Sequence, residues 1–202
     1  EVASTGRANP SECILPEVFL SALRRLNPQI DDEILKNILQ DFRKDYSGTD
    51  MVDTNYKFYN QIRNGIKVKT RNQHREDFDI VKLIDFDHPE RNEFHCVNQM
   101  WIKGHFRYRR PDVLLFVNGL PVVFIELKNS TVKIEESYNK NLVSYRKDIP
   151  NIFAMNQICV LSNGLQTKRG AWNAGYEFFF EWLRVNNEKE KLNREEIAEH
   201  GL

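Results

Sequence analysis

Two carboxylates and a lysine stand at the ends of two apolar runs, 113–117 and 120–125, which a short turn separates. Asp112 enters the first run, and Glu126 and Lys128 follow the second. Charged side chains are rare in runs this apolar unless a partner group compensates them. Carboxylate oxygens are ligands that Mg²⁺ prefers, and an ammonium group can neutralise charge that develops on a phosphate. The pattern therefore predicts a metal site that acts on a phosphodiester, as in a nuclease.

The turn between the runs decides whether the three side chains meet. Alternate residues of a strand share a face, so Glu126 and Lys128 point the same way, about 6.6 Å apart along the strand. A two-residue turn at 118–119 would set Asp112 opposite Ile125, on the wrong face. A three-residue loop or a bulge would set Asp112 directly opposite Glu126. We therefore predict that the turn is not the simple two-residue type, although its Asn-Gly sequence favours that type.

Charge assigns a role to each group in this arrangement. Asp112 and Glu126 would supply oxygen ligands to Mg²⁺, together with water and the backbone carbonyl of Leu127. The ion would polarise a phosphoryl oxygen and lower the pKa of a bound water. Lys128 would position that water and neutralise the developing charge. The structural alternative is an exposed strand end on which Glu126 pairs with Lys128 while Asp112 caps a turn.

The length of 202 residues suffices for one sizeable core. We predict one domain over 13–184, made of a helical part, 13–64, and a sheet-containing core, 65–184. Residues 1–12 are polar and predict a flexible start. Residues 185–202 predict a charged helical tail.

Composition excludes several classes of protein. Three well-separated cysteines without a C-x-x-C spacing argue against a disulfide framework and suit a reducing cytoplasm. Five histidines form no close ligand pair, which argues against a zinc site. No run is long and apolar enough to span a membrane. We therefore expect a cytoplasmic protein without a membrane partner.

The spacing of apolar residues changes along the chain. Helical spacing predicts a helix over 15–26 and a short one over 55–61. It also predicts a helix between these two, which starts behind a cap at Asp31 and Asp32 and ends at Ser47-Gly48. A period nearer two follows Gly65. The later elements that we predict are strands over 81–86 and 94–102, the hairpin 112–128, a helix over 132–148 and a strand over 158–161. An aromatic run at 176–182 fits either a late strand or the start of a helix, and its side chains either fill the core or dock another domain. Such an order indicates an α/β or α+β domain around a mixed sheet.

Basic residues gather in two stretches, although the whole chain has no net charge. The first stretch lacks acidic residues and consists of Arg63, Lys67, Lys69, Arg71 and Arg75. It could serve a DNA channel or a partner domain. In the second stretch, Arg107, Arg109 and Arg110 lead into the hairpin and could touch the DNA backbone. A solvated strand end is the alternative.

Wider motifs surround the three candidate residues. Pro111-Asp112 followed by Glu126-x-Lys128 resembles the PD-(D/E)xK nuclease superfamily. Further strings, spread over roughly residues 13–182, resemble the N-terminal nuclease region of the R subunit of type I restriction-modification enzymes. They are Asp85-Phe86-Asp87-x-Pro89-Glu90-x-Asn92-x-Phe94, Asn98-Gln99, Arg110-Pro111-Asp112, Asn118-Gly119-Leu120-Pro121, Glu126-Leu127-Lys128-Asn129, Asp148-Ile149-Pro150, Asn156-Gln157 and Ser162-Asn163-Gly164. The resemblance implies an α/β restriction-endonuclease-like core, with a central mixed β-sheet flanked by helices.

The resemblance also implies an activity. It is that of a type I site-specific deoxyribonuclease, which cuts double-stranded DNA with Mg²⁺ in a complex with methyltransferase (M) and specificity (S) subunits. An ATP-driven translocase on the same polypeptide powers it. This chain has no G-x-x-x-x-G-K-[ST] loop, so ATP use would belong to a motor region that the charged tail leads to. The alternatives are a non-catalytic DNA-binding or subunit-docking module on the same fold, and another nuclease of the superfamily such as a junction resolvase, which the flanking strings disfavour.

Two departures from the family pattern concern the site. The family usually carries Q-x-x-x-Y on the helix after the lysine, and here Asn141 and Tyr145 stand at those positions, on one helix face. The resemblance places both in the catalytic site, although the asparagine is one methylene shorter and Tyr145 could equally be a core residue. An upstream helix that carries a glutamate in relatives is either not identifiable here or precedes Glu1.

Overall fold

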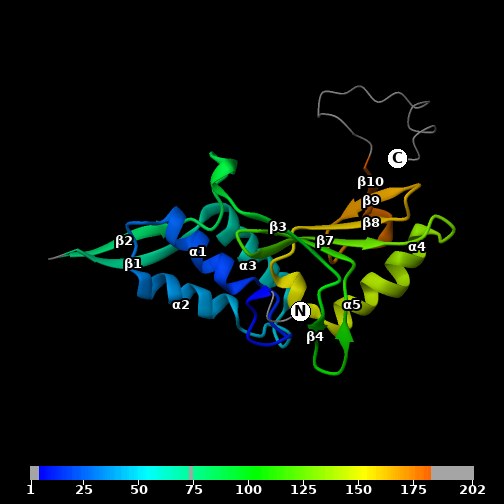
Figure 1. The fold of residues 1–202 in the computed structure, drawn as a ribbon, viewed down its shortest axis with the longest axis horizontal. Coiled ribbons are helices and arrows are strands. Elements are labelled where there is room, and N and C mark those ends of the chain that lie inside the picture. Colours follow the sequence, from blue (N-terminus) through cyan, green and yellow to red (C-terminus); the bar gives the residue numbers. More distant parts are fainter. Residues whose placement is uncertain (1–4, 73–74, 183–202) are drawn as a thin grey trace.

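A six-stranded mixed sheet forms the centre of the computed structural model, which describes residues 5–72 and 75–182 (Figure 1). The strand order is β10-β9-β8-β7-β6-β3. The strands are β3 (Phe94–Asn98), β6 (Val113–Val117), β7 (Leu120–Leu127), β8 (Ile158–Ser162), β9 (Thr167–Gly170) and β10 (Phe180–Glu181). Strands β7 and β8 are parallel, and the other neighbours are antiparallel. With helices packed beside this sheet, the predicted α/β fold with a central mixed sheet is confirmed.

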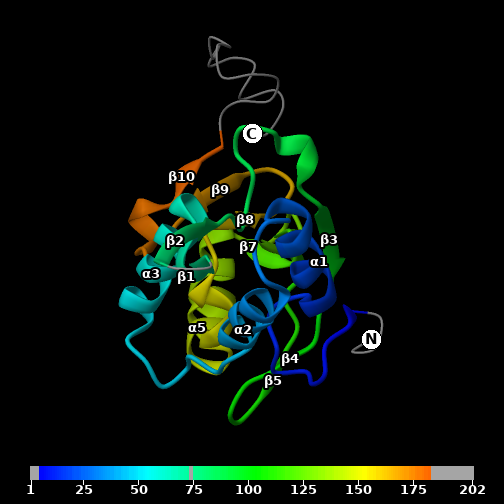
Figure 2. The ribbon, with the colours of Figure 1, turned by 90° about the vertical axis from the view of Figure 1, so that its left-hand side faces the viewer.

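Three helices precede the sheet and pack at the end that carries the β6–β7 turn (Figure 2). They are α1 (Pro16–Leu26), α2 (Asp32–Phe42) and α3 (Met51–Asn64). Helix α1 follows the predicted bounds, because Pro16 starts it. The Asp31 side chain caps α2 as predicted, by accepting from the Glu33 N–H, but α2 ends at Phe42, before the predicted stop at Ser47-Gly48. Helix α3 is longer than predicted, because Asp50 caps it by accepting from two backbone N–H groups.

A long antiparallel ribbon, β1 (Ile66–Asn72) and β2 (Arg75–Val81), extends away from the body of the domain (Figure 1). The predicted strand over 81–86 is therefore wrong, since β2 ends at its first residue. The Asn27 side chain binds both the N–H and the carbonyl of Lys82, at 2.7 and 2.9 Å, and so takes the groups that a continuing strand needs.

The strand predicted over 94–102 is divided into β3 and β4. Gln99 has a φ of 51°, which interrupts an extended chain. Strand β4 (Ile102–Lys103) pairs with β5 (Tyr108–Arg109) in a small separate hairpin. Short 3₁₀ turns lie at Pro89–Arg91, Pro150–Ala154 and Tyr176–Phe178. The aromatic run at 176–182 thus begins as a helical turn and ends as strand β10.

The β6–β7 hairpin has a two-residue turn, contrary to the prediction. Val117 pairs with Leu120, and Asn118 and Gly119 both have positive φ, at 50° and 81°. The register nevertheless shifts further along the hairpin, because Phe116 pairs with Pro121 but Leu115 pairs with Val123. Val122 is left as a β-bulge. The bulge alternative is therefore the one that the structure uses.

One continuous helical segment follows the hairpin and confirms the helix predicted over 132–148. Its parts are α4 (Ile134–Glu136), a π-helical stretch (Ser137–Leu142) and α5 (Val143–Asp148). It packs against Leu114, Phe116 and Phe124 in one core. Leu120 and Val122 belong instead to a second core with α1–α3, so the bulge moves β7 from one core to the other.

The segment predicted as a flexible start contains two buried charged residues. The buried Arg7 donates to the carbonyls of Glu12 and Trp101, and Glu12 is buried in turn. Residues 1–4 and the predicted tail over 185–202 lie outside the described part of the chain. Within the part that is described, no helix has both the length and the apolar character needed to cross a membrane.

Candidate active site

Glu126 lies at the end of β7 with its side chain turned into the domain and 2% exposed. Lys128 Nζ donates to Glu126 Oε1 at 2.8 Å. The two side chains therefore share one side of the strand, as the sequence predicted. The burial of Glu126 argues against the structural alternative, which required an exposed strand end.

Asp112 joins these two groups through the bulge. Since Val113 pairs with Ile125, the next pair along the hairpin sets Asp112 opposite Glu126. The Leu127 N–H donates to Asp112 Oδ2 at 2.8 Å, which holds the carboxylate at the end of β7. The backbone carbonyl of Asp112 accepts from Gln99 N–H, also at 2.8 Å. Both the side chain and the backbone of Asp112 are therefore anchored.

The helical segment 134–148 adds two further groups. Asn141, in the π-helical stretch, donates through Nδ2 to Glu126 Oε1, so the shorter amide still reaches the glutamate. Tyr145 is buried against Phe124, with 5.4 Å between the ring centroids, and its hydroxyl donates to the Arg110 carbonyl at 3.4 Å. Both residues therefore lie on one helical segment beside Glu126 and Phe124, and their place in a catalytic site stays a prediction. Tyr145 is also a core residue, so its two alternatives are not exclusive.

The surroundings of Glu126 disfavour its negatively charged form. Burial raises the pKa of Glu126 above its ordinary value, and the charge on Asp112 acts in the same direction, while Lys128 opposes them. Burial and then the charge on Glu126 raise the pKa of Tyr145, so the phenol stays protonated. A bound cation would relieve the repulsion between the two carboxylates.

One atom of the site lacks a partner that a cation could supply. Glu126 Oε1 accepts from both Lys128 and Asn141, whereas Glu126 Oε2 is buried without a hydrogen-bond partner. Buried polar atoms are usually satisfied, so this oxygen points to an additional ligand. The described residues contain no cluster of three or more His, Cys, Asp or Glu side chains suited to a metal. Two carboxylates completed by backbone, water or phosphate oxygens fit Mg²⁺, which usually keeps several waters.

Comparison with known proteins decides the family. The chain matches the model of the type I restriction enzyme R protein N terminus over residues 1–178. The chain belongs to this family. It is 32% identical over 192 residues to the type I restriction enzyme HindI endonuclease subunit of Haemophilus influenzae, and 30% identical over 190 residues to the putative MjaIXP endonuclease subunit of Methanocaldococcus jannaschii. These matches cover 93% and 90% of this chain but 18% of each relative. The chain thus spans less than a fifth of their length.

The arginines that we expected to touch DNA have different surroundings. Arg109 Nε donates to Asp148 Oδ2 at 2.6 Å, so this side chain ties β5 to the end of α5. Arg110 lies over the ring of Trp101, with 5.2 Å from its guanidinium carbon to the ring centroid. Arg107 is exposed. The ion pair gives Arg109 a partner within the domain, and DNA contact by the three arginines stays a prediction.

Two side chains of the first basic stretch have contacts within the domain. Arg63 donates to the Tyr59 hydroxyl at 2.9 Å, and Lys67 lies over the ring of Phe78 at 4.3 Å. The side chains of Arg71 and Arg75 lie outside the described residues.

Gln99 is a candidate that the sequence reasoning passed over. It lines an open hollow together with Asp112, Lys128 and Asn129, and it adopts a positive φ that non-glycine residues rarely accept. The Asn98-Gln99 string carried the signal, since both residues belong to the family resemblance, with Asn98 ending strand β3 and Gln99 following it. What the string lacked was any indication that residue 99 lies beside Asp112.

Proposed function

We propose that this chain is the Mg²⁺-dependent endonuclease domain of a type I restriction R subunit, cleaving phosphodiester bonds of double-stranded DNA. The observation that carries the proposal is the meeting of Asp112, Glu126 and Lys128 at the end of the hairpin, with one buried oxygen of Glu126 lacking a partner. Family membership supports it, because the relatives are named as endonuclease subunits.

Each residue has a task in this mechanism. Asp112 and Glu126, with the Leu127 carbonyl, would hold the ion, which when bound polarises a phosphoryl oxygen and acidifies a water. Lys128 Nζ, beside Glu126, would orient the attacking water and neutralise charge on the phosphate. Asn141 fixes the Glu126 carboxylate, and the buried ring of Tyr145 keeps bulk water from its inner side.

The wider assembly is part of the same proposal. Cleavage would take place in the cytoplasm within a complex that includes M and S subunits. ATP would be consumed by a motor region of the longer R polypeptide. The recognised DNA sequence would then come from another subunit.

Replacement of Lys128 in the full-length R subunit tests catalysis. With M and S subunits, ATP and Mg²⁺, Lys128→Ala is expected to lower the cleavage rate about a hundredfold or more, because it removes a preorganised cation. ATP hydrolysis stays unchanged. Lys57→Ala, at an exposed position of α3, is the matched control and cuts like the native subunit. Cleavage by Lys128→Ala at the native rate would support the non-catalytic module instead.

Calorimetry with Mn²⁺ tests the ligand role separately. Asp112→Ala is expected to abolish the binding heat, because one of two carboxylates is lost. Unaltered binding would remove Asp112 from the ligand set.

A further inference from the structure

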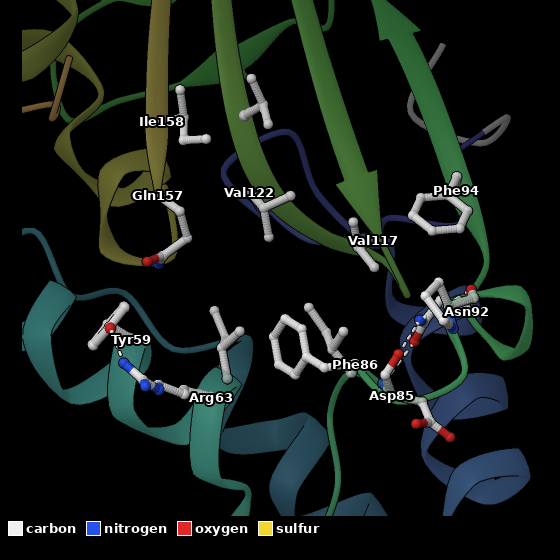
Figure 3. A pocket seen from close by; sticks show the side chains of 14 residues that line it. Tyr59, Arg63, Asp85, Phe86, Asn92, Phe94, Val117, Val122, Gln157 and Ile158 are labelled. Atoms are coloured by element: carbon white, nitrogen blue, oxygen red, sulfur yellow. Dashed lines mark hydrogen bonds between the residues drawn. The ribbon is translucent and has the colours of Figure 1, made fainter. Parts of the chain in front are cut away.

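A second, very different hollow lies at the opposite end of strands β6 and β7. It is a pocket of about 720 Å³ between helix α3, the loop that follows β2, and the turn end of the sheet (Figure 3). Its walls are largely apolar and include Ile62, Val117 and Val123. The catalytic proposal makes no use of it.

Large apolar side chains at the rim of the pocket are exposed. Phe86 is 60% exposed, Phe94 is 64% exposed and Ile158 is 39% exposed. Single exposed apolar residues are common, but several around one apolar pocket mark an interaction site. The rim of the pocket therefore has the character of an interaction surface.

The polar side chains that line the pocket are already engaged within the domain. Arg63 donates to the Tyr59 hydroxyl, Gln157 Nε2 donates to the Met155 carbonyl at 2.9 Å, and Asp85 forms an ion pair with Arg91 at 3.2 Å. The rest of the lining is mostly apolar. A phosphate backbone is thus a poor match, and an apolar protein segment is a good one.

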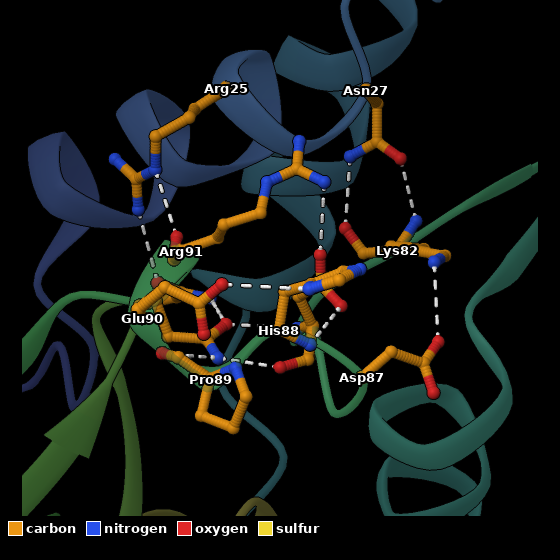
Figure 4. A network of polar contacts seen from close by, with 11 residues as sticks. Arg25, Asn27, Lys82, Asp87, His88, Pro89, Glu90 and Arg91 are labelled. Carbon is orange, nitrogen blue, oxygen red and sulfur yellow. Dashed lines mark hydrogen bonds and ion pairs between the residues drawn. The ribbon is translucent and has the colours of Figure 1, made fainter.

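A network of polar contacts, much of which is drawn in Figure 4, fixes the loop that carries Phe86. Asp85 Oδ1 accepts from the His88 N–H, and Asn92 exchanges two hydrogen bonds with the backbone of Asp85, at 2.9 and 2.7 Å. Arg25 Nε donates to the Arg91 carbonyl. This network is what the Asp85-to-Phe94 string encodes. Because the loop is preorganised, docking on it would cost little ordering entropy.

The lengths of the relatives indicate what covers the pocket. This chain corresponds to 18% of the relatives, so most of the R polypeptide lies outside it. An apolar surface that was covered only intermittently would promote aggregation. The remainder of the same polypeptide is the one partner that is always present. We infer that an apolar segment of the R polypeptide outside this chain inserts into the pocket and fixes the nuclease domain to the rest of the subunit. This inference rests on the proposed longer R polypeptide and not on the catalytic roles of Asp112, Glu126 and Lys128.

Thiol accessibility in the full-length R subunit tests whether the pocket is covered. Phe94→Cys and the control Phe106→Cys would each be made with Cys96→Ser, which removes an exposed native thiol. Phe106, 97% exposed on the β4–β5 hairpin, lies away from the pocket lining. The thiol at 94 is expected to react about tenfold or more slowly than that at 106, and at the same rate after denaturation. Equal rates in the native subunit would overturn the inference.

Photo-crosslinking identifies the occupant. With p-benzoylphenylalanine in place of Phe86, the R subunit alone is expected to give a crosslink within one polypeptide, to a peptide beyond the family-matched region. The same substitution at Phe106 gives none. A product of doubled mass, a product formed only with the M subunit, or no product within the chain would each overturn the inference. Cleavage activity is not the readout, so a failed catalytic proposal would leave this test intact.

Discussion

Asp112 and Glu126 stand opposite each other across β6 and β7 because Val122 bulges out of β7. The carbonyl of the bulged residue is satisfied from outside the hairpin. It accepts from the Gln157 N–H at 2.8 Å and from Asn156 Nδ2 at 3.3 Å. The geometry of the candidate active site therefore depends on a loop that touches neither carboxylate.

This dependence predicts an effect of Asn156→Ala at a distance. The variant leaves buried carbonyls with fewer donors, and we expect a loss of about 2 kcal/mol in the free energy of unfolding. Mn²⁺ binding should weaken as the bulge loosens. Gln157→Ala is the control, because its side chain binds only the Met155 carbonyl while its backbone N–H is retained. Native Mn²⁺ affinity in a folded Asn156→Ala variant would show that the bulge holds without this side chain.

Substitutions of Asn141 test the contribution of the asparagine that stands where the family usually has glutamine. Asn141→Ala removes the donor to Glu126 Oε1, and we expect a tenfold to hundredfold loss of cleavage, which is about the cost of losing a group that orients a metal ligand. Asn141→Gln restores the residue usual in the family but is one methylene too long for this backbone. We expect an intermediate rate in a cleavage assay of the full-length assembly. If Asn141→Gln cleaved DNA faster than the native subunit, asparagine would not be the amide that fits the π-helical stretch.

Glu126→Gln tests whether the charged Glu126 carboxylate lowers the thermal stability of the metal-free chain. Because burial raises the pKa of Glu126 above 4.5, the folded chain holds this proton more tightly than the unfolded chain. The contribution of the group to stability is complete below pH 4.5 and is lost as the pH rises through the raised pKa. In chelator at pH 8 we expect the variant to melt about 2–4 °C higher, as ~1 kcal/mol would give.

The same variant supplies its own control. At pH 4 the native glutamate is protonated as well, so the difference in Tm should disappear. Added Mn²⁺ should stabilise the native chain and not the variant. A Tm difference that is the same at both pH values would exclude ionisation of Glu126 as its cause.

Gly119→Ala tests the turn that begins the hairpin. Gly119 has a φ of 81°, and a Cβ there would lie 2.6 Å from the Leu15 carbonyl oxygen and 2.8 Å from the Phe19 nitrogen. Because both contacts are with backbone, we expect a loss of about 3 kcal/mol in chemical denaturation. Gly48→Ala is the control, since a Cβ at residue 48 meets nothing within 4 Å. Similar stabilities of the two variants would contradict the close approach of α1 to the turn.

Local patterns were sufficient for part of this molecule. Helix α1 and the start of helix α2 follow the prediction because their signals, Pro16, the Asp31 cap and apolar spacing, lie within a few residues of one another. The strand predicted over 81–86 failed because Asn27, more than fifty residues away, takes the backbone groups of Lys82. Propensity along the chain contains no information about such a contact.

The same division applies to the candidate site. By residue type and spacing, the sequence alone determined which groups could do the chemistry, namely Asp112, Glu126 and Lys128. The helix that would face them was implied by the family resemblance. Only the tertiary structure decided that they meet. The Asn-Gly turn by itself would have turned Asp112 to the other face, and the bulge at Val122 that corrects the register is held by hydrogen bonds from residues 156 and 157. Register within a hairpin is set by the free energy of all its contacts, and some of these come from distant parts of the chain.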